Sequence, residues 1–358
     1  MLTTLTGLLA TTTLAATTPL APLDWTETPT VPGNAVLYTT EAVDGEQWAV
    51  GISLEQEQGG PGLRFHPLAI RRVGSTWRQT PGPFPDGRLD DVMVRGRLDV
   101  WAVGATEDSA GGGRGILQHW NGRAWSLVDV PEPPTVNSGF TAVDGSPGTL
   151  LVGRTATSPD GEYSTSVMRY AGGRWQALPE EGLQHVVYID DLEPVQGEEM
   201  LAAGIGGLAR YDGTAWNKVD LPITIPEGRQ YEIAQLVVRS ANDIWAVGEK
   251  GSDEFWRQPL ALHFDGKTWT ELPAPKRTGQ FHDLEFVDGR PLAVGGDPNT
   301  GEPLIAEYDG KEFVQTTTPP GAGYLHGSTT AGDHVWTVGV AAKPGLELPY
   351  AAVGKPLN

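Results

Sequence analysis

Residues 243–269 read DIWAVGEKGSDEFWRQPLALHFDGKTW, and this stretch decides the fold. An apolar segment ends in Val-Gly at Gly248, and a second apolar segment runs through Asp265-Gly266 to Trp269. An Asp-Gly pair between alternating apolar runs is a strong β-hairpin signal, because these residues accept positive φ. Neither segment has the period of an amphipathic helix. The stretch therefore predicts short antiparallel strands.

The two phrases in this stretch recur along the chain, which makes this a repeat protein. The first phrase, an apolar run closed by Val-Gly or Ala-Gly, ends at Gly51, Gly104, Gly153, Gly204, Gly248, Gly295 and Gly339. The second follows the first six of these and closes on Trp77, Trp125, Trp175, Trp216, Trp269 and Phe313. Units of about 45–50 residues with four short strands are typical of propeller blades. We therefore expect an all-β, seven-bladed β-propeller of four-stranded antiparallel blades.

The seventh repeat lacks its outer strand, and the N-terminal region supplies a match for it. Residues 24–29 read DWTETP, similar to KTWTELP at residues 267–273. We expect the strand that contains Trp25 to complete the last blade, so that the ring has no exposed edge. The predicted organisation is a leader over residues 1–22 and a single propeller domain over residues 23–358.

Residues 1–22 carry no charged side chain and are rich in Thr, Leu and Ala. They resemble the apolar and small-residue parts of a secretory signal, although the basic n-region is missing. They are too rich in Thr for a membrane span. We expect a secreted or cell-surface protein. Abundant Arg, Ala, Gly and Pro indicate a bacterial source.

The charge balance limits the partners. Lys plus Arg number 25 and Asp plus Glu number 45, so the formal net charge is −20. Binders of nucleic acid present a basic face, and anionic lipid attracts basic segments, so neither partner fits. A cationic ligand, a metal ion or a basic partner fits better. The chain has no Cys, which excludes disulfides, thiolate metal sites and a Cys nucleophile.

Candidate site residues emerge when the inner strands are aligned by counting back from each glycine. Asp90-Asp91, Asp190-Asp191, Ala234-Gln235 and His282-Asp283 fall level, and His326 falls level in the last blade. Seven inner strands converge on one axis, so we expect an acidic ring with two His at the channel mouth. Asp91, Asp191 and Asp283 are the candidate ligands for a divalent cation such as Ca²⁺. His282, Asp283 and His326 are the candidate catalytic acid and base. The alternative is that these residues only cap or hydrate the channel mouth.

Phe255 and Trp256 lie in a long loop that has no counterpart in the other repeats. Variable loops on a repeated scaffold often carry function. With Gln235, this pair forms the candidate ligand-binding set. The alternative is that the pair folds back over its own blade.

The phrases DIWAVG and FDGKTW resemble repeats of kelch-like and sialidase-like propellers secreted by bacteria, and of photosystem assembly-factor propellers. The resemblance covers residues 24–358 and implies the fold alone, since the sialidase S-x-D-x-G-x-x-W box is absent. Two functions stay open. The first is a monomeric, exported binding protein that presents its rim and acidic channel mouth to a small molecule, peptide or glycan. The second is an enzyme of the lyase, hydrolase or cyclase type that uses the Asp and His groups.

Overall fold

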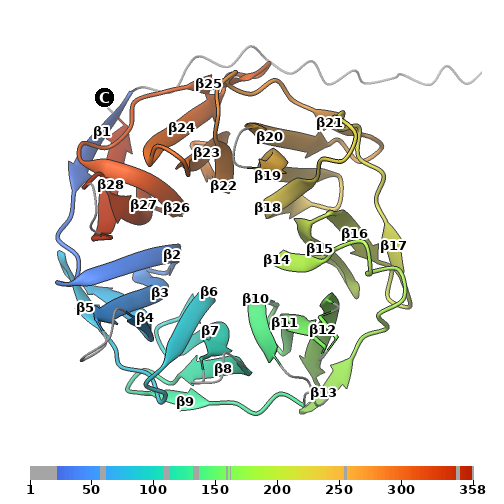
Figure 1. Ribbon diagram of the computed structural model, residues 1–358, viewed down its shortest axis with the longest axis horizontal. Coiled ribbons are helices and arrows are strands. Elements are labelled where there is room, and N and C mark those ends of the chain that lie inside the picture. The colour runs from blue at the N-terminus through green and yellow to red at the C-terminus, as the bar shows by residue number, and fades with distance from the viewer. Residues whose placement is uncertain are drawn as a thin grey trace, which may run out of the picture.

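The computed structural model describes residues 22–56, 62–107, 113–131, 137–158, 160–161, 163–253, 256–343 and 347–356. Within these ranges the chain is all-β, and its strands form antiparallel sheets arranged around a central channel (Figure 1). Five of these sheets have four strands, and one has eight, because the pair of Ile205 with Glu232 joins two groups of four. The sheets are those of a β-propeller, and each successive group of four among the 28 described strands is here called a blade. No helix in the described part of the chain is long and apolar enough to cross a membrane.

The strands follow the repeats, and in each blade the first strand lies nearest the channel (Figure 1). Blades 1 and 2 contain β2 (Asn34–Val43), β3 (Glu46–Gln56), β4 (Leu63–Val73), β5 (Thr76–Gln79), β6 (Gly87–Gly96), β7 (Asp99–Thr106), β8 (Gly115–Trp120) and β9 (Trp125–Leu127). Blades 3 and 4 contain β10 (Asn137–Asp144), β11 (Thr149–Thr157), β12 (Tyr163–Ala171), β13 (Arg174–Ala177), β14 (Tyr188–Gln196), β15 (Glu199–Ile205), β16 (Gly207–Tyr211) and β17 (Trp216–Lys218). Blades 5 and 6 contain β18 (Tyr231–Ser240), β19 (Asp243–Asp253), β20 (Trp256–Phe264), β21 (Trp269–Glu271), β22 (Gln280–Val287), β23 (Arg290–Asp297), β24 (Glu302–Tyr308) and β25 (Phe313–Gln315).

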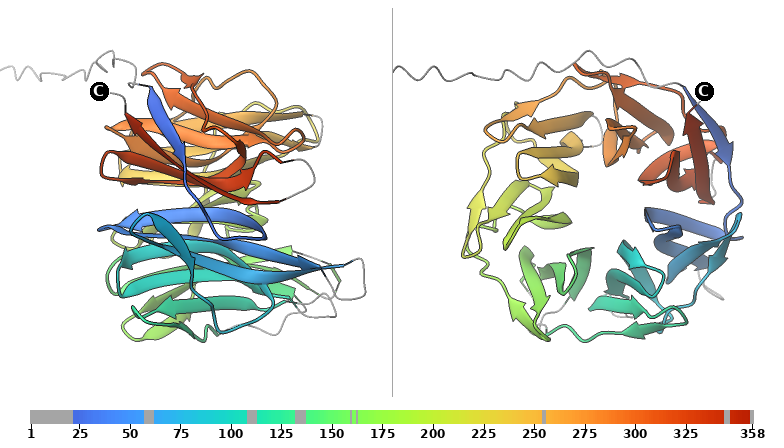
Figure 2. Two further views of the ribbon diagram at one scale, coloured as in Figure 1. Left: turned by 90° about the vertical axis from the view of Figure 1, so that its left-hand side faces the viewer. Right: turned by 180° about the vertical axis from the view of Figure 1, so that it is seen from behind.

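The last sheet joins the two ends of the described chain. It contains β26 (Ala322–Ala331), β27 (His334–Ala341), β28 (Pro349–Pro356) and β1 (Leu23–Glu27), in the order β1-β28-β27-β26. Strand β1 runs antiparallel to β28 at the outer edge (Figure 2). Trp25 is only 9% exposed, and its Nε1 donates a hydrogen bond to the Thr317 carbonyl at 3.2 Å. Trp25 thus stands in the outer strand of the last sheet, the position that the sequence match assigned to it.

The recurring tryptophans pack between sheets, as residues that repeat in every blade should. Trp48 of blade 1 is fully buried against Trp120 and Trp125 of blade 2, with ring centroids 5.1 and 5.2 Å apart. Edge-to-face and tilted aromatic pairs of this kind stabilise a core beyond the area that they bury. The core of this fold therefore lies in the layers between neighbouring blades.

A β-bulge interrupts each of the seven described inner strands, and the recurring glycine explains where. In blade 2, Leu89 faces Gly104 and Asp91 faces Val103, so Asp90 is the extra residue. A Cβ on Gly104 would overlap the carbonyl oxygen of Arg88 at this bend. The equivalent glycine faces the residue before the bulge in six of the blades. Only glycine fits there, which is why Val-Gly or Ala-Gly recurs in the sequence.

Candidate functional site

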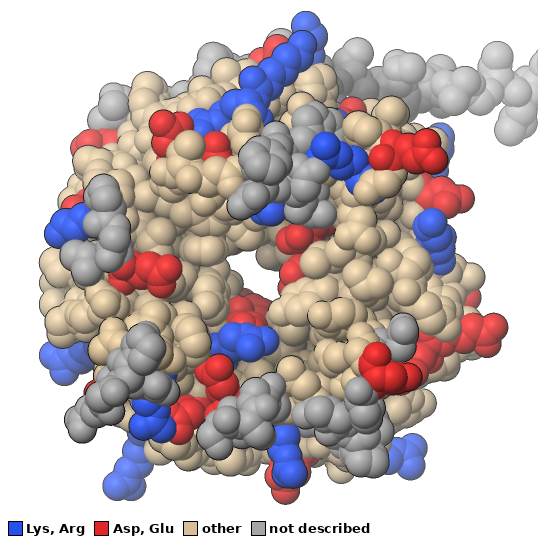
Figure 3. All heavy atoms as spheres, viewed as in Figure 1, with Lys and Arg blue, Asp and Glu red and all other residues tan. Residues whose placement is uncertain are grey.

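The bulges turn one side chain from each inner strand toward the central channel. These residues are Tyr38, Asp90, Thr141, Asp190, Ala234, His282 and His326. All seven line a cavity of about 220 Å³ inside the ring, here called the channel cavity. Acidic side chains border the central opening, with a basic group beside them (Figure 3). The alignment from the glycines therefore located five of the seven channel positions; it missed Tyr38 and Thr141.

The candidate metal ligands Asp91, Asp191 and Asp283 directly follow three of these bulges. In all three, both carboxylate oxygens accept backbone N–H groups, one from the next residue and one from the next blade. One oxygen of Asp283 accepts the Leu284 N–H at 2.7 Å. The other accepts the Ser328 N–H at 2.5 Å, from the inner strand of the next blade. Asp91 and Asp191 do the same with the N–H groups of Val143 and Leu236 at 2.8 and 2.7 Å.

Farther along the inner strands, other side chains also accept backbone N–H groups from the next blade. Glu41 accepts the Val94 N–H at 2.5 Å, and Thr329 Oγ1 accepts the Ala42 N–H at 3.0 Å. Apart from the single pair of Ile205 with Glu232 between β15 and β18, the inner strand is the edge of its group of four described strands, so half of its N–H groups have no partner strand. The carboxylate or hydroxyl of the preceding blade satisfies them. These links give Asp91, Asp191 and Asp283 a clear role in joining the blades.

The structure does not gather these carboxylates around one point. Among the described residues, no group of three or more His, Asp and Glu side chains is arranged to hold a metal ion. Asp91, Asp191 and Asp283 are spread over three separate inner strands, β6, β14 and β22. Calcium binding by this chain stays a prediction.

His282 is the centre of a hydrogen-bonded chain at the channel mouth. Its Nε2 lies 2.7 Å from Gln280 Nε2 and 2.7 Å from Tyr324 Oη. Gln280 Oε1 accepts a hydrogen bond from Arg257, so the Gln280 amide nitrogen must donate to His282. His282 Nε2 is then the acceptor, and the proton of the neutral ring sits on Nδ1. Arg257 therefore sets the tautomer of His282 through one amide.

The pKa values of the two histidines are lowered, so both rings are neutral at physiological pH. Burial lowers the pKa of His326 to about 4. Burial, His326 and Arg257 hold the pKa of His282 well below its usual range. Neutral imidazoles are competent proton acceptors.

The pKa values of the acids around the channel are raised. Burial and the neighbouring Glu232 raise the pKa of Asp190, and burial raises that of Glu232. Asp190 Oδ2 has no hydrogen-bond partner in the described part of the chain. Burial raises the pKa of Asp90 to about 6, against the opposing effect of Arg88. The channel cavity is thus lined by both neutral His and poorly ionised acids, a mixed set of proton acceptors and donors.

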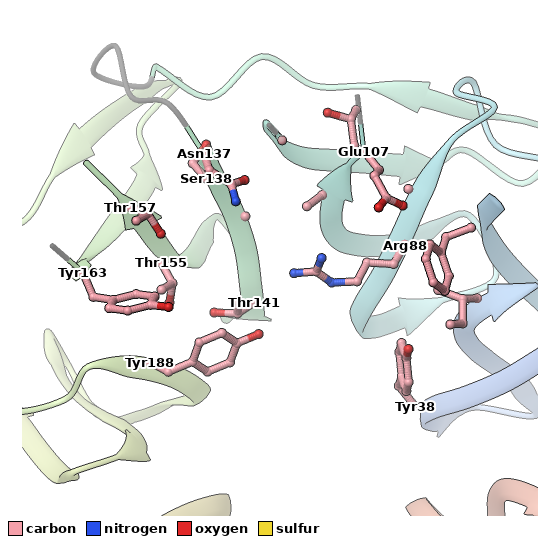
Figure 4. A pocket seen from close by; sticks show the side chains of 17 residues that line it. Tyr38, Arg88, Glu107, Asn137, Ser138, Thr141, Thr155, Thr157, Tyr163 and Tyr188 are labelled. Carbon is pink, nitrogen blue, oxygen red and sulfur yellow. The ribbon is translucent and has the colours of Figure 1, made fainter. Parts of the chain in front are cut away.

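A larger cavity of about 390 Å³ adjoins the channel cavity and is lined mainly by residues of blades 2 and 3 (Figure 4). We call it the rim pocket. Its polar and aromatic walls include Tyr38, Arg88, Glu107, Asn137, Ser138, Thr141, Thr155, Thr157, Tyr163 and Tyr188. Tyr38, Thr141 and Tyr188 line both cavities, so the two adjoin. The pocket lies where second strands lead into third strands, the connections that vary most in sequence.

Two threonine hydroxyls in the rim pocket have no hydrogen-bond partner among the residues that the structure describes. Thr141 and Thr155 are 5% and 8% exposed, and neither Oγ1 has a hydrogen-bond partner among the described residues. Both side chains lie at the pocket wall in Figure 4. A buried hydroxyl without a partner costs about 1–3 kcal/mol, so such groups are normally satisfied. These two groups thus mark a place where a bound molecule would be favoured.

The remaining candidate residues are only partly described. Gln235 lines the channel cavity, and its Nε2 donates to the Leu236 carbonyl at 3.2 Å. Phe255 lies outside the described residues. Trp256 is described in its backbone alone, as the first residue of β20, paired with Asp253. Whether the Phe255-Trp256 pair contacts a ligand stays a prediction.

The fold of this chain is similar to that of solved sialidase-like and YCF48-like β-propellers. YCF48 from Cyanidioschyzon merolae is 14% identical, with 93% of this chain and 99% of that chain covered and a TM-score of 0.57. A protein of unknown function from Dyadobacter fermentans is 12% identical over 93% of this chain and 98% of that chain, with a TM-score of 0.54. A sialidase from Trypanosoma rangeli, in complex with the inhibitor DANA, is 12% identical, with a TM-score of 0.49. The match covers 90% of this chain and 55% of the sialidase. No family model matches the chain.

Proposed function

We propose that this chain is an exported, monomeric β-propeller, a ring of seven blades closed by β1, that binds a small polar ligand in the rim pocket. One observation carries the proposal: Thr141 and Thr155 are more than nine-tenths buried in the pocket wall, and neither hydroxyl has a hydrogen-bond partner within the described part of the chain. The cavity of about 390 Å³ falls within the range of about 300–1,000 Å³ that is usual for ligand sites.

A screen for compounds that raise the melting temperature tests the binding function, because a ligand that binds only the native state stabilises it by mass action. We expect small hydroxylated compounds to stabilise the protein. The double variant Thr141→Val, Thr155→Val keeps the side-chain shape and removes both hydroxyls. It should lose the ligand-induced rise in melting temperature and keep the melting temperature of the free protein. An equal rise in this variant would contradict binding in the rim pocket.

A second candidate function is catalysis at the channel mouth. The observation that favours it is the neutral His282, held by Gln280 and Tyr324 in a cavity that acids with raised pKa values also line. If the protein converts a compound that it binds, His282→Gln should abolish turnover and leave binding nearly unchanged. Undiminished turnover in this variant would exclude the enzyme function at His282.

Export is tested separately, by expressing the full chain and identifying the N-terminus of the mature protein. We expect residues 1–22 to be removed and the protein to be found outside the cytoplasm. A full-length protein retained in the cytoplasm would contradict export and leave the binding proposal standing.

A further inference from the structure

Arg88 stands on the wall between the rim pocket and the channel cavity. Its Nε donates to both carboxylate oxygens of Asp90, at 2.8 and 3.0 Å. Asp90 lines the channel cavity, whereas Arg88 lines the rim pocket. The terminal nitrogens of Arg88 point toward Thr141 and Tyr188 in Figure 4. Asp90 therefore holds the guanidinium of Arg88 through Nε, and the two terminal nitrogens of Arg88 face the rim pocket.

Two tyrosine hydroxyls flank this guanidinium and keep their protons at neutral pH. Burial and the neighbouring Asp90 raise the pKa of Tyr38 to about 12. The same two causes raise the pKa of Tyr188, whose hydroxyl lies within hydrogen-bond reach of Arg88. Burial disfavours the charge on Arg88, but Asp90, Tyr188 and Tyr38 together outweigh burial, so the pKa of Arg88 is raised. The pocket thus offers a permanent cation between two neutral hydroxyl groups.

We propose, on the basis of the ligand pocket proposed above, that the rim pocket takes a sugar acid of the uronic type. The carboxylate lies on the terminal nitrogens of Arg88 between Tyr38 and Tyr188, and ring hydroxyls bond to Thr141 and Thr155. A guanidinium fork matches a carboxylate in shape and charge. Hydroxyl groups of the ligand would hydrogen-bond to the hydroxyls of Thr141 and Thr155. An apolar or cationic ligand would leave these two hydroxyls unsatisfied.

The charges of the pocket favour a single carboxylate. Arg88 and Glu107 are the charged side chains among the described lining residues. Glu107 is exposed at the open edge, where water screens its charge. A phosphate dianion on Arg88 would place two negative charges beside a cation that is already paired with Asp90, so a ligand with a single negative charge is favoured. The same carboxylate chemistry occurs in a free sugar acid and at the end of an acidic glycan, so the test uses both.

Calorimetric titration with a matched pair of sugars tests the proposal. D-Galacturonate and D-galactose differ only at C6, where one has a carboxylate and the other a hydroxymethyl group. We expect galacturonate to bind at least tenfold more tightly, the usual worth of a charge-assisted hydrogen bond. Arg88→Met should remove that difference and leave the affinity for galactose unchanged. Arg239→Met is the control: Arg239 is also 44% exposed and bonded to an Asp, but does not line the pocket.

Gly139→Ala is a second variant, which fills the ligand position without disturbing the fold. Its Cβ would lie 3.5 Å from Arg88 Nη2 and 3.4 Å from the Cβ of Ala105, both ordinary contacts. It should weaken galacturonate binding at least tenfold at an unchanged melting temperature. Trigalacturonate that binds more tightly than the monomer identifies an acidic glycan as the source, and equal affinities identify the free acid.

Several outcomes overturn the proposal. Equal affinities for galactose and galacturonate, or undiminished galacturonate binding by Arg88→Met, would exclude the carboxylate site. N-Acetylalanine that binds as tightly as galacturonate would replace the sugar acid with a peptide terminus. In these cases ligand binding that still depends on Thr141 and Thr155 keeps the proposed function. Failure of every compound in the screen to bind would overturn both.

Discussion

Adjacent carboxylates on one inner strand have different surroundings, and the bulge is the cause. Asp190 is the extra residue of its bulge and lines the channel cavity, with Oδ2 unpartnered in the described part of the chain. Asp191, the next residue, accepts two backbone N–H groups and joins blade 4 to blade 5. A bulge re-aims one side chain relative to the regular alternation of a strand. Identical residue types, one position apart, therefore have separate roles.

This difference predicts opposite effects of the same substitution. Asp283→Asn turns one acceptor into an NH₂ group that faces a backbone donor, so we expect a loss of about 1–3 kcal/mol in unfolding free energy. Burial raises the pKa of Asp283 to about 6, so the group is ionised at pH 7.5. Asp190→Asn instead removes a buried acid among like charges and should leave stability equal or higher. Urea unfolding at pH 7.5 measures both; an Asp283→Asn protein as stable as the parent would contradict the link.

Threonine provides a second matched pair. Thr40 Oγ1 donates to the Trp48 carbonyl at 2.7 Å in a buried position, whereas Thr141 Oγ1 has no partner among the described residues. We expect Thr40→Val to lower the free energy of unfolding by about 1 kcal/mol. Thr141→Val should not lower it. Thermal unfolding without ligand distinguishes the two, and equal destabilisation would mean that the Thr141 hydroxyl is already satisfied by the fold.

At the scale of strands, the glycine phrase made much of the fold predictable. A Cβ on Gly104 or on an equivalent glycine would overlap the inner strand. These glycines therefore indicate both where the inner strand lies and where its bulge is. Counting back from the glycine therefore reached Asp90, Asp190 and His282. It failed in blade 3, where Arg154, one residue beyond Gly153, faces the residue before the bulge.

The spacing of the glycines could not predict the rim pocket. Arg88 and Tyr188 belong to blades 2 and 4 and meet across the inner strand of blade 3 (Figure 4). Their proximity depends on side-chain direction and on the curvature of the ring, neither of which a repeat spacing encodes. The links that Asp91 and Asp283 make between blades were also not predictable from the sequence. Sequence does not show that the next blade presents an unpaired N–H to each carboxylate.

Strand β1 offers a test at the same scale. It pairs with β28 from Leu23 to Glu27, buries Trp25, and is continued by Thr28 and Thr30, which bond to the carbonyls of Ala351 and Pro349. Deleting residues 1–33 should expose the edge of β28, lower the melting temperature and promote aggregation. Deleting residues 1–22 should preserve the melting temperature, because the described pairing of β1 begins at Leu23. Light scattering during thermal unfolding compares the two, and equal melting of both proteins would contradict the role of β1.

The whole molecule concentrates acids in the centre of the ring. The buried or channel-facing carboxyls whose pKa values are raised include Glu41, Asp90, Asp91, Asp144, Asp190, Asp191, Glu193, Glu232, Glu249, Asp283 and Glu285. They lie on inner strands that converge, apart from Glu249 on the second strand of blade 5. The convergence of the inner strands on one axis thus brings together like charges that are far apart in the sequence. Part of the net charge of −20 therefore lies where repulsion between carboxylates lowers the stability of the folded ring.

This arrangement predicts that mild acid stabilises the protein. A buried acid with a raised pKa binds its proton more tightly in the native state than in the unfolded state, where carboxyls titrate near pH 4. Burial raises the pKa of Glu285 and of Glu249 to about 8, and that of Asp91 to about 7. Their stabilisation is complete below about pH 4 and is lost as the pH rises through these values. The two histidines act in the opposite sense, because their lowered pKa values remove stability as the pH falls below about 6.5.

The acids outnumber the histidines, so we expect the melting temperature to be higher at pH 6 than at pH 8. Glu285→Gln isolates one contribution, because Gln keeps an acceptor oxygen for the Phe286 N–H and the Thr330 hydroxyl. It should raise the melting temperature at pH 8 and reduce the difference between pH 8 and pH 6. Glu312→Gln, an exposed substitution away from the channel, is the control for net charge and should leave that difference unchanged. A parent protein with a lower melting temperature at pH 6 than at pH 8 would contradict this prediction. It would show that the central carboxylates are already ionised and satisfied, so that the ring carries no electrostatic strain.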